Sequence, residues 1–571
     1  MRHVTGAGSV LIARALSHAT AACVVVALLL FATPELGPVA GHEGSSRQAA
    51  AQPTGGEAPT SGDLRLTFTT FLRSGAGIAA TVLVYGALGV AAFAISYGSM
   101  SRTRHATPAK RPESRSTRRR LGSGRSDRSR NDDGLARVLA AILAASCFLL
   151  PLVFTIALAD VFAQPKSQLL WFIALVALTA LVIAFMRGAT PTRFGVIDIG
   201  LVGFVLLTVL ATIFSINLNQ SLKGERLQYQ GLLSISSYVV LFVAARWSMR
   251  NDDHARVLSA TLIASATLSA IYAIAQWFSL DPIWDALFKD RVFSTVGQAN
   301  ALGSILGMAG VSAIGLAGVG RRRLLVLAVA LVLVGAAFVL TFSRGAYLGL
   351  PVGVAVAIAV LVANGMPASV RTFMPKFAAG LAAVALILVV GAAIWEPARG
   401  FFGRVVDRVT SIPNATESSN RSHLDLWEVG IRIASEHPIL GTGPDTYVLL
   451  FPRYRDEVLT PDRAAVMAKF RPESAHNVYI STAAGSGLPS LVMYLFIIGG
   501  TLVAVFRVAR REVPIEVRLA LAGLAGAAVV HLVTDAFMTG EPSSAAVFWV
   551  LLGAGAGLAE RHLDDGRPRP R

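Results

Sequence analysis

Apolar runs of about twenty residues recur along this chain from residue 138 onwards, and they constrain its fold more than any other feature. A run of that length is what an α-helix needs to cross the hydrocarbon core of a bilayer. We place twelve such runs near residues 138–159, 168–186, 196–216, 232–248, 256–277, 300–318, 324–342, 346–363, 376–395, 487–506, 517–537 and 542–559. The sequence therefore predicts an all-α, polytopic integral membrane protein.

Two further apolar runs precede this twelve-helix core, near residues 21–31 and 75–97, and bring the expected total to about fourteen helices. The first run is short enough to be a signal peptide, but we favour a retained helix. Residues 34–74 are rich in Gly, Pro, Ser and Ala, which is typical of an external loop. We expect residues 1–100 to form a two-helix extension.

Residues 101–137 contain twelve basic and four acidic residues among many Ser, Gly and Pro residues. Such a composition predicts a disordered linker, and its positive charge places it in the cytoplasm. A linker of this kind can also contact anionic membrane lipid.

The overall composition agrees with a membrane protein, because 54% of the residues are hydrophobic and only 15% are charged. The net charge of +17 lies mainly in the connections between apolar runs, so it indicates topology and not nucleic-acid binding. Cys23 and Cys147 both lie within apolar runs, and no disulfide framework is expected.

The positive-inside rule assigns a side to each connection once the linker is taken as cytoplasmic. The alternate connections expected inside are all basic, and the C-terminal tail, residues 561–571, is basic as well. The segments expected outside are 217–231, 278–299, 343–345, 396–486 and 538–541. We therefore expect a transmembrane core at 138–395, one large extracytoplasmic loop at 396–486 and C-terminal transmembrane helices at 487–560.

Four polar features stand out on the expected outer side. Arg226 follows Glu225 shortly before a helix, and Arg291 precedes Asn300, which stands where it can cap the next helix. Arg344 lies between two helices, beside Gly345, which we expect to let the chain turn. His476 closes the long outer loop.

Each of these residues alone can be explained by an ordinary structural role, such as an arginine reaching headgroup phosphate. Together they indicate an anion site, because guanidinium groups bind phosphate bidentately and imidazole can take a proton near neutrality. A lipid diphosphate held by Arg226, Arg291 and Arg344, with His476 beside it, would use all four. We interpret His531 and Asp535, four residues apart near a helix end, as a structural pair.

Motifs for other chemistries are missing from the sequence. The external His and acidic residues lack the spacing of metal ligands, and no P-loop, dinucleotide-binding fingerprint or GxSxG elbow occurs. We therefore expect no metal and no cofactor, so the energy for a reaction must come with the substrate.

Several motifs, in this order along residues 138–560, resemble the O-antigen ligase and polymerase superfamily of bacterial membrane proteins. They are Glu225-Arg226 with Gln230-Gly231, the segment from Arg291 to Asn300, Ser343-Arg344-Gly345, the segment from His437 to Gly443, and His476-Asn477 with Tyr479. Residues 1–134 have no counterpart in this pattern.

The resemblance implies a glycosyltransferase in the bacterial plasma membrane with its active face outside. It would move a glycan from undecaprenyl diphosphate to an acceptor sugar on an envelope glycan or lipid, with inversion and without a metal. It implies that Arg226, Arg291 and Arg344 hold the diphosphate, that His476 is the catalytic base and that Arg344 also acts in catalysis. Gln230, Asn300, Asn477 and Tyr479 are the expected supporting residues.

Alternatives remain at this point. A polysaccharide polymerase uses the same chemistry with a different acceptor, and one long outer loop favours the ligase. A transporter for lipid or polysaccharide would need charges within the spans and repeated halves, which are not evident here. A scaffold protein would leave the outer arginines unexplained.

Overall fold

The computed structural model of the chain describes residues 123–187, 195–281, 283, 291–317, 321–365, 396–412, 414 and 418–564. The two predicted N-terminal helices, the external loop between them, residues 101–122, the predicted run at 376–395 and the last residues of the tail lie outside the described residues.

Every predicted core run that falls on described residues contains a helix, and these residues contain no strand. Nine helical segments within the described ranges are long and apolar enough to cross a membrane. They are α5 (Ala163–Met186), α6 (Val196–Ile213), α9 (Asp252–Trp277), α10 with the 3-10 turn η2 (Ala299–Ser312 and Ala313–Leu316), α11 (Arg321–Leu340), α12 (Arg344–Val362), α19 (Leu488–Ala509), α20 (Ile515–Asp535) and α21 (Pro542–Asp564). The protein is a polytopic, all-helical membrane protein as predicted, although the structure does not confirm the count of fourteen.

Two further helices complete the described bundle, and one of them differs from expectation. α8 (Leu232–Ser248) is apolar but shorter than the nine. α4 (Ser123–Leu149) begins within the segment predicted to be a disordered linker, so residues 123–137 are helical. Arginine is a good helix former, and a spanning helix can extend into such a segment once its first turns exist. α4 also ends ten residues before the predicted end of its run, because Pro151 cannot continue a helix.

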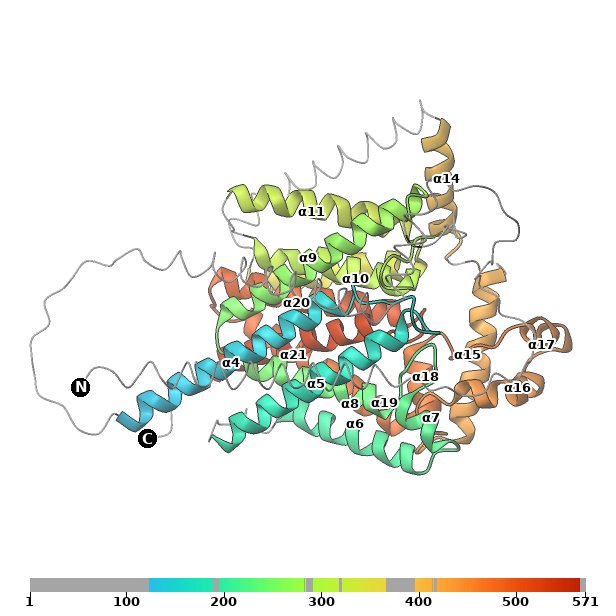
Figure 1. Cartoon of the computed structure of the whole chain (residues 1–571), viewed down its shortest axis with the longest axis horizontal. Coiled ribbons are helices and arrows are strands. Elements are labelled where there is room, and N and C mark those ends of the chain that lie inside the picture. Colours follow the sequence, from blue (N-terminus) through green and yellow to red (C-terminus); the bar gives the residue numbers. More distant parts are fainter. Residues whose placement is uncertain are drawn as a thin grey trace, which may run out of the picture. The chain divides into compact units, whose positions relative to one another are not determined.

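α20 and α21 form the centre of the bundle, as Figure 1 shows. In the most apolar windows of these helices 83% and 94% of the residues are buried. α12 packs closely on α20 because Gly349 and Gly353 face the Val530 backbone and side chain with no room for a Cβ atom. Small residues at helix interfaces are how membrane helices approach each other closely.

One end of the bundle contains a buried network of ion pairs. At this end Arg246 of α8 is buried and pairs with Asp198 of α6 and Glu560 of α21, at 2.5 and 2.7 Å. These residues lie at or beside connections that the positive-inside rule assigns to the same side of the membrane. Arg246 therefore ties three helices together, in addition to any role in topology.

The opposite end carries the helices of the long polar segment (Figure 1). They are α14 (Glu396–Thr410), α15 (Ser418–Glu436), α16 (Tyr447–Val458), α17 (Pro461–Met467) and α18 (Val478–Ser486), with the short α7 (Leu218–Lys223) beside them. Val429, Tyr447 and Phe451 belong to a small hydrophobic core that these loop helices form. The predicted outer loop is thus an ordered helical cap over its described residues.

Candidate active site

Arg291 lies at the capped end of the bundle, in the loop between α9 and α10. Its Nε donates to the Thr341 carbonyl oxygen at 2.9 Å, and its Nη2 donates to Oδ1 of Asn300 at 2.6 Å. Both partners are neutral. Burial, together with the positive charges of Arg408 and Arg344, lowers the pKa of Arg291 to about 10. Arg291 is therefore a partly buried cation with cationic neighbours, and a bound anion would offset the repulsion between them.

Contacts from α5 hold the loop that carries Arg291. Nζ of the buried Lys166 donates to the carbonyl oxygens of Thr295 and Val296, at 2.9 and 3.0 Å. Gly297 has φ +89°, and a Cβ atom there would lie 2.2 Å from the Phe162 ring. Only glycine fits this position, so Gly297 and Lys166 fix the path of the loop.

Arg344 begins α12 and lies beside the same asparagine. The Ser343 side chain caps the helix, accepting from the Ala346 N–H at 3.3 Å, and donates to Asn300 Oδ1 at 3.0 Å. Asn300 was expected to cap its own helix; its Oδ1 instead joins Arg291 to Ser343. The chain turns at Phe342, with φ +45°, and not at Gly345, whose Cβ position would lie 3.1 Å from Phe537. Gly345 thus allows close packing.

Arg408 of α14 is a third arginine at this site, and the sequence reasoning missed it. Its Nε donates to the Phe342 carbonyl oxygen at 3.1 Å, next to Arg344. The only sequence signal for it is the recurrence of arginines at 404 and 408, one helical turn apart in a polar segment. Arg291, Arg344 and Arg408 are called the arginine cluster below.

α15 connects the arginine cluster to His476. Arg344 donates to Oδ1 of Asn420 on α15 and, at 2.8 Å, to Oγ of Ser411. One turn further along α15, the His423 ring meets the His476 ring edge to face, with centroids 5.5 Å apart. Residues three positions apart lie on one face of a helix, so the same face of α15 contacts Arg344 and His476.

His476 lies in a strained backbone conformation between α17 and α18. Its φ is +50°, in the left-handed region, and its N–H donates to Oγ of Ser474 at 3.1 Å. Such conformations concentrate at functional sites. Burial, and then the neighbouring His423, lower the pKa of His476 to about 4. Its imidazole is therefore neutral at physiological pH and has a nitrogen able to accept a proton.

A hollow with a volume of about 470 Å³ opens beside this histidine pair. His423, His476, Arg471 and Glu473 contribute its polar lining, and Leu426, Met467 and Phe470 contribute apolar surface. We call it the outer hollow. It offers a polar and an apolar wall next to the candidate base.

Arg226 is exposed, on the loop that precedes α8. The carboxylate of Glu225 lies 4.0 Å from Arg471, at the outer hollow. Asp445 holds this loop, since its Oδ2 accepts from the backbone N–H groups of Glu225 and Gln230 at 2.6 and 3.0 Å. The structure therefore brings Arg291, Arg344 and Asn300 into one contact network, and the contacts of the Arg226 loop lead to the outer hollow.

The two supporting residues next to His476 have structural contacts. Asn477 caps α18 by accepting from the N–H groups of Tyr479 and Ile480. The Tyr479 hydroxyl donates to the Leu532 carbonyl oxygen at 2.6 Å, and so docks α18 on α20. Both residues hold the segment that presents His476.

Comparison with known proteins agrees with these features. Residues 329–495 match the model of the family described as O-antigen ligase. The matched stretch includes Arg344, Arg408 and His476, and Arg291 precedes it. A search of curated protein sequences gave no match. The match over residues 329–495 confirms the resemblance of this chain to the O-antigen ligase and polymerase superfamily.

Proposed function

We propose that this protein is an O-antigen ligase-like glycosyltransferase that moves a glycan from undecaprenyl diphosphate to an acceptor sugar. The observation that carries the proposal is the arginine cluster, whose partly buried member Arg291 has neutral hydrogen-bond partners, and which is linked through one face of α15 to His476. The family suggests a ligase-like or polymerase-like activity, and the donor, the acceptor and the residue roles are our proposal.

The arginine cluster is suited to a diphosphate. A guanidinium group has five N–H donors, and Arg291 uses two of them on Thr341 and Asn300. The remaining donors can bind phosphate oxygens. Arg291 stays charged at neutral pH even with its pKa lowered to about 10. The cluster would stabilise the negative charge that grows on the diphosphate as it leaves, which is where fixed charges accelerate a reaction most.

His476 would act as the base. Its neutral imidazole takes the proton of the acceptor hydroxyl while that oxygen attacks the anomeric carbon opposite the diphosphate. The new glycosidic bond forms as the bond to the diphosphate oxygen breaks, so the anomeric configuration inverts. An imidazole of pKa about 4 is a weak base, but a bound diphosphate dianion nearby would raise its pKa towards the useful range.

The expected face is extracytoplasmic. The basic connections gather at one end of the bundle, where Arg246 and Arg561 lie, and the arginine cluster lies with the loop helices at the other. Basic connections stay in the cytoplasm, which supports placing the site outside the bacterial plasma membrane, where lipid-linked glycans are presented.

The test of this proposal uses Arg344→Ala and His476→Ala in cells that lack the native copy. Each variant should abolish glycan transfer while the protein is still inserted and expressed. Arg432→Ala is the matched control, because Arg432 is an exposed arginine of α15 that pairs with Glu436 and should be dispensable. Normal surface polysaccharide from both site variants would end the proposal.

The acceptor decides between ligase and polymerase, and one observation separates them. In cells without this protein, long polymer accumulating on the lipid carrier would identify a ligase. Single repeat units on the carrier would identify a polymerase. The single long outer loop favours the ligase.

A further inference from the structure

A second cavity lies inside the bundle, between α8, α18, α20 and α21, with a volume of about 110 Å³. Ser474 and Val478 line it, whereas His476, between them in sequence, lines the outer hollow. The segment 473–478 therefore separates the two spaces. We call this second space the inner cavity.

Three polar atoms of the inner cavity are buried without a hydrogen-bond partner among the described residues. They are Nε2 of Gln228, Oγ of Ser481 and Oδ1 of Asp535. The side chains of Gln228 and Asp535 belong to residues that are each only 3% exposed. Buried polar groups in native proteins almost always have partners, and each unpaired one is costly. Three of them around one cavity are groups that a hydrogen-bonding ligand would satisfy.

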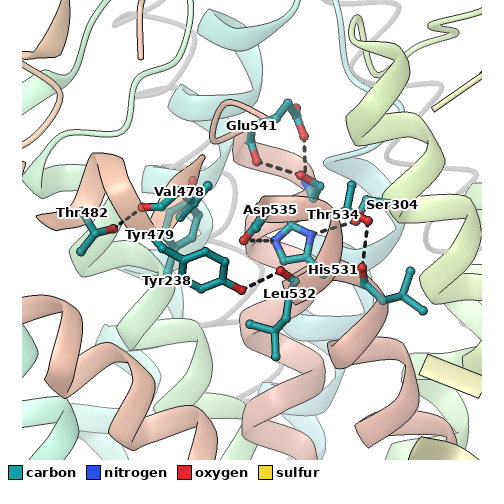
Figure 2. Close-up of polar contacts among 12 residues, drawn as sticks. Tyr238, Ser304, Val478, Tyr479, Thr482, His531, Leu532, Thr534, Asp535 and Glu541 are labelled. Carbon is teal, nitrogen blue, oxygen red and sulfur yellow. Dashed lines mark hydrogen bonds and ion pairs between the residues drawn. The ribbon is translucent and has the colours of Figure 1, made fainter. Parts of the chain in front are cut away.

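The polar groups around the inner cavity are fixed in position. The other carboxylate oxygen of Asp535 lies 3.3 Å from Nε2 of His531, whose Nδ1 lies 2.9 Å from Oγ of Ser304 (Figure 2). The Tyr238 hydroxyl donates to Oε1 of Gln230 at 3.2 Å. Because His531 holds one carboxyl oxygen of Asp535, the other oxygen, which is unpaired, is presented to the cavity in a set geometry.

The lining of the inner cavity does not suit the diphosphate, because no basic residue in the described part of the chain contributes to it. Its described residues include the acidic side chains of Asp445 and Asp535 and neither an arginine nor a lysine. The aromatic side chains of Tyr238, Tyr494 and Trp549 form much of the remaining wall. A neutral ligand with several hydroxyl groups fits this lining, because its hydroxyls donate to Asp535 and accept from Gln228 while the rings cover its C–H surface.

We propose that the inner cavity binds one neutral sugar unit of the glycan substrate, remote from the sugar that reacts. The unit is remote because segment 473–478 lies between the cavity and the outer hollow that His476 faces. The inference rests on the proposed function, since that function supplies a glycan. It goes beyond that function by assigning a sugar-recognition site to Gln228, Ser481 and Asp535, which would set which repeat unit is accepted.

The test measures binding directly, with the full-length protein in lipid nanodiscs. Glucose, galactose and N-acetylglucosamine are titrated as separate probes, and tryptophan fluorescence reports binding because Trp549 lines the cavity. Inorganic pyrophosphate is titrated separately as a probe of the arginine cluster. Ser481→Leu fills the cavity and Gln228→Leu removes a donor. Ser435→Leu is the matched control, because Ser435 is an exposed serine of α15.

We expect saturable binding of at least one sugar by the wild-type protein and by Ser435→Leu. The dissociation constant of that sugar should rise at least about tenfold in Ser481→Leu and in Gln228→Leu. Pyrophosphate binding should be unchanged in both variants. Retained pyrophosphate binding also shows that each variant is folded.

Two results would overturn the inference. One is the absence of saturable sugar binding in a wild-type protein that binds pyrophosphate, which would mean a cavity filled only by water. The other is sugar binding that stays unchanged in both cavity variants. The protein could also bind sugar with the expected pattern but fail to bind pyrophosphate. That result would support the sugar site in the inner cavity and contradict the proposed diphosphate site, so the two proposals can fail separately.

Discussion

Replacing Arg291 with glutamine should remove most glycan transfer while leaving the protein about as stable as before. The two effects separate because Arg291 lies partly buried beside Arg408 and Arg344, and its pKa is lowered first by burial and then by the repulsion from these charges. Glutamine removes this repulsion, and its amide can still donate to Asn300. The lost hydrogen bonds and the relieved repulsion therefore oppose each other in the free energy of unfolding.

The size of the activity loss follows from the donors that Arg291 leaves for a ligand. Two of its five N–H groups donate hydrogen bonds within the protein, so the others can donate to phosphate oxygens. Removing one fixed donor to a developing oxyanion typically lowers kcat by about 10²- to 10³-fold, or about 3 to 4 kcal/mol. Arg291→Lys keeps the charge but not the planar fork, so we expect a smaller loss.

The assay is transfer of a lipid-diphosphate-linked glycan by purified protein in nanodiscs, together with the thermal unfolding midpoint of each variant. Arg432→Gln on α15 is the control for removing an arginine from this end of the molecule. A change of less than about threefold in kcat/KM for Arg291→Gln would refute the reasoning. So would a large fall in the midpoint, because Arg291 would then be a structural residue.

Three further predictions follow from the same contacts. The pKa of His476 is lowered to about 4, so its imidazole stays unprotonated as the pH falls through 6.5. The value of kcat/KM, which reports the free enzyme, should therefore stay flat from pH 7 to about 5 and fall only nearer 4. A decline centred near 6.5 in the pH–rate profile would contradict this. Gly297→Ala should sharply lower the thermal midpoint because its Cβ would overlap Phe162, whereas Gly335→Ala, with nothing within 4 Å, should have little effect or stabilise α11. Asp445→Ala leaves two backbone N–H groups unpaired, and the free energy of unfolding should fall by about 1 to 3 kcal/mol for each one that stays buried. Denaturant titration measures this loss. Asp445→Asn keeps an acceptor oxygen and should lower the free energy of unfolding by less.

The sequence predicts the bundle well because spanning helices have a strong local signature. Apolar runs of bilayer length and alternating basic connections locate the helices and group their connections at two ends. Boundaries are less certain: α4 extends into a segment whose composition suggests disorder, and it ends early at Pro151.

The candidate site is only partly visible in the sequence. Arg291, Asn300 and Arg344 lie at the ends of neighbouring helices, so their proximity follows from topology. The contact between Arg344 and Asn420, by contrast, joins positions 76 residues apart and depends on how α14 and α15 fold over the bundle. No local pattern encodes that arrangement, which is why Arg408 and the role of α15 were missed.

The inner cavity could not be predicted for a related reason. Gln228, Ser481 and Asp535 come from three separate segments, and each has an ordinary local context. Only packing shows that their polar atoms face one space. The predicted pairing of His531 with Asp535 is confirmed, but a pattern of two residues does not reveal that one carboxylate oxygen of Asp535 remains unpaired.

The central claim is that the arginine cluster binds a lipid diphosphate and that His476 acts on a bound substrate without holding it. Titration of undecaprenyl diphosphate into the protein in nanodiscs, followed by its ³¹P signal, tests this most directly. Arg344→Ala should weaken binding by about 10- to 100-fold, as expected for losing a charged hydrogen bond, while His476→Ala should bind as tightly as wild type. Equal affinity in the wild-type protein and Arg344→Ala would contradict the account.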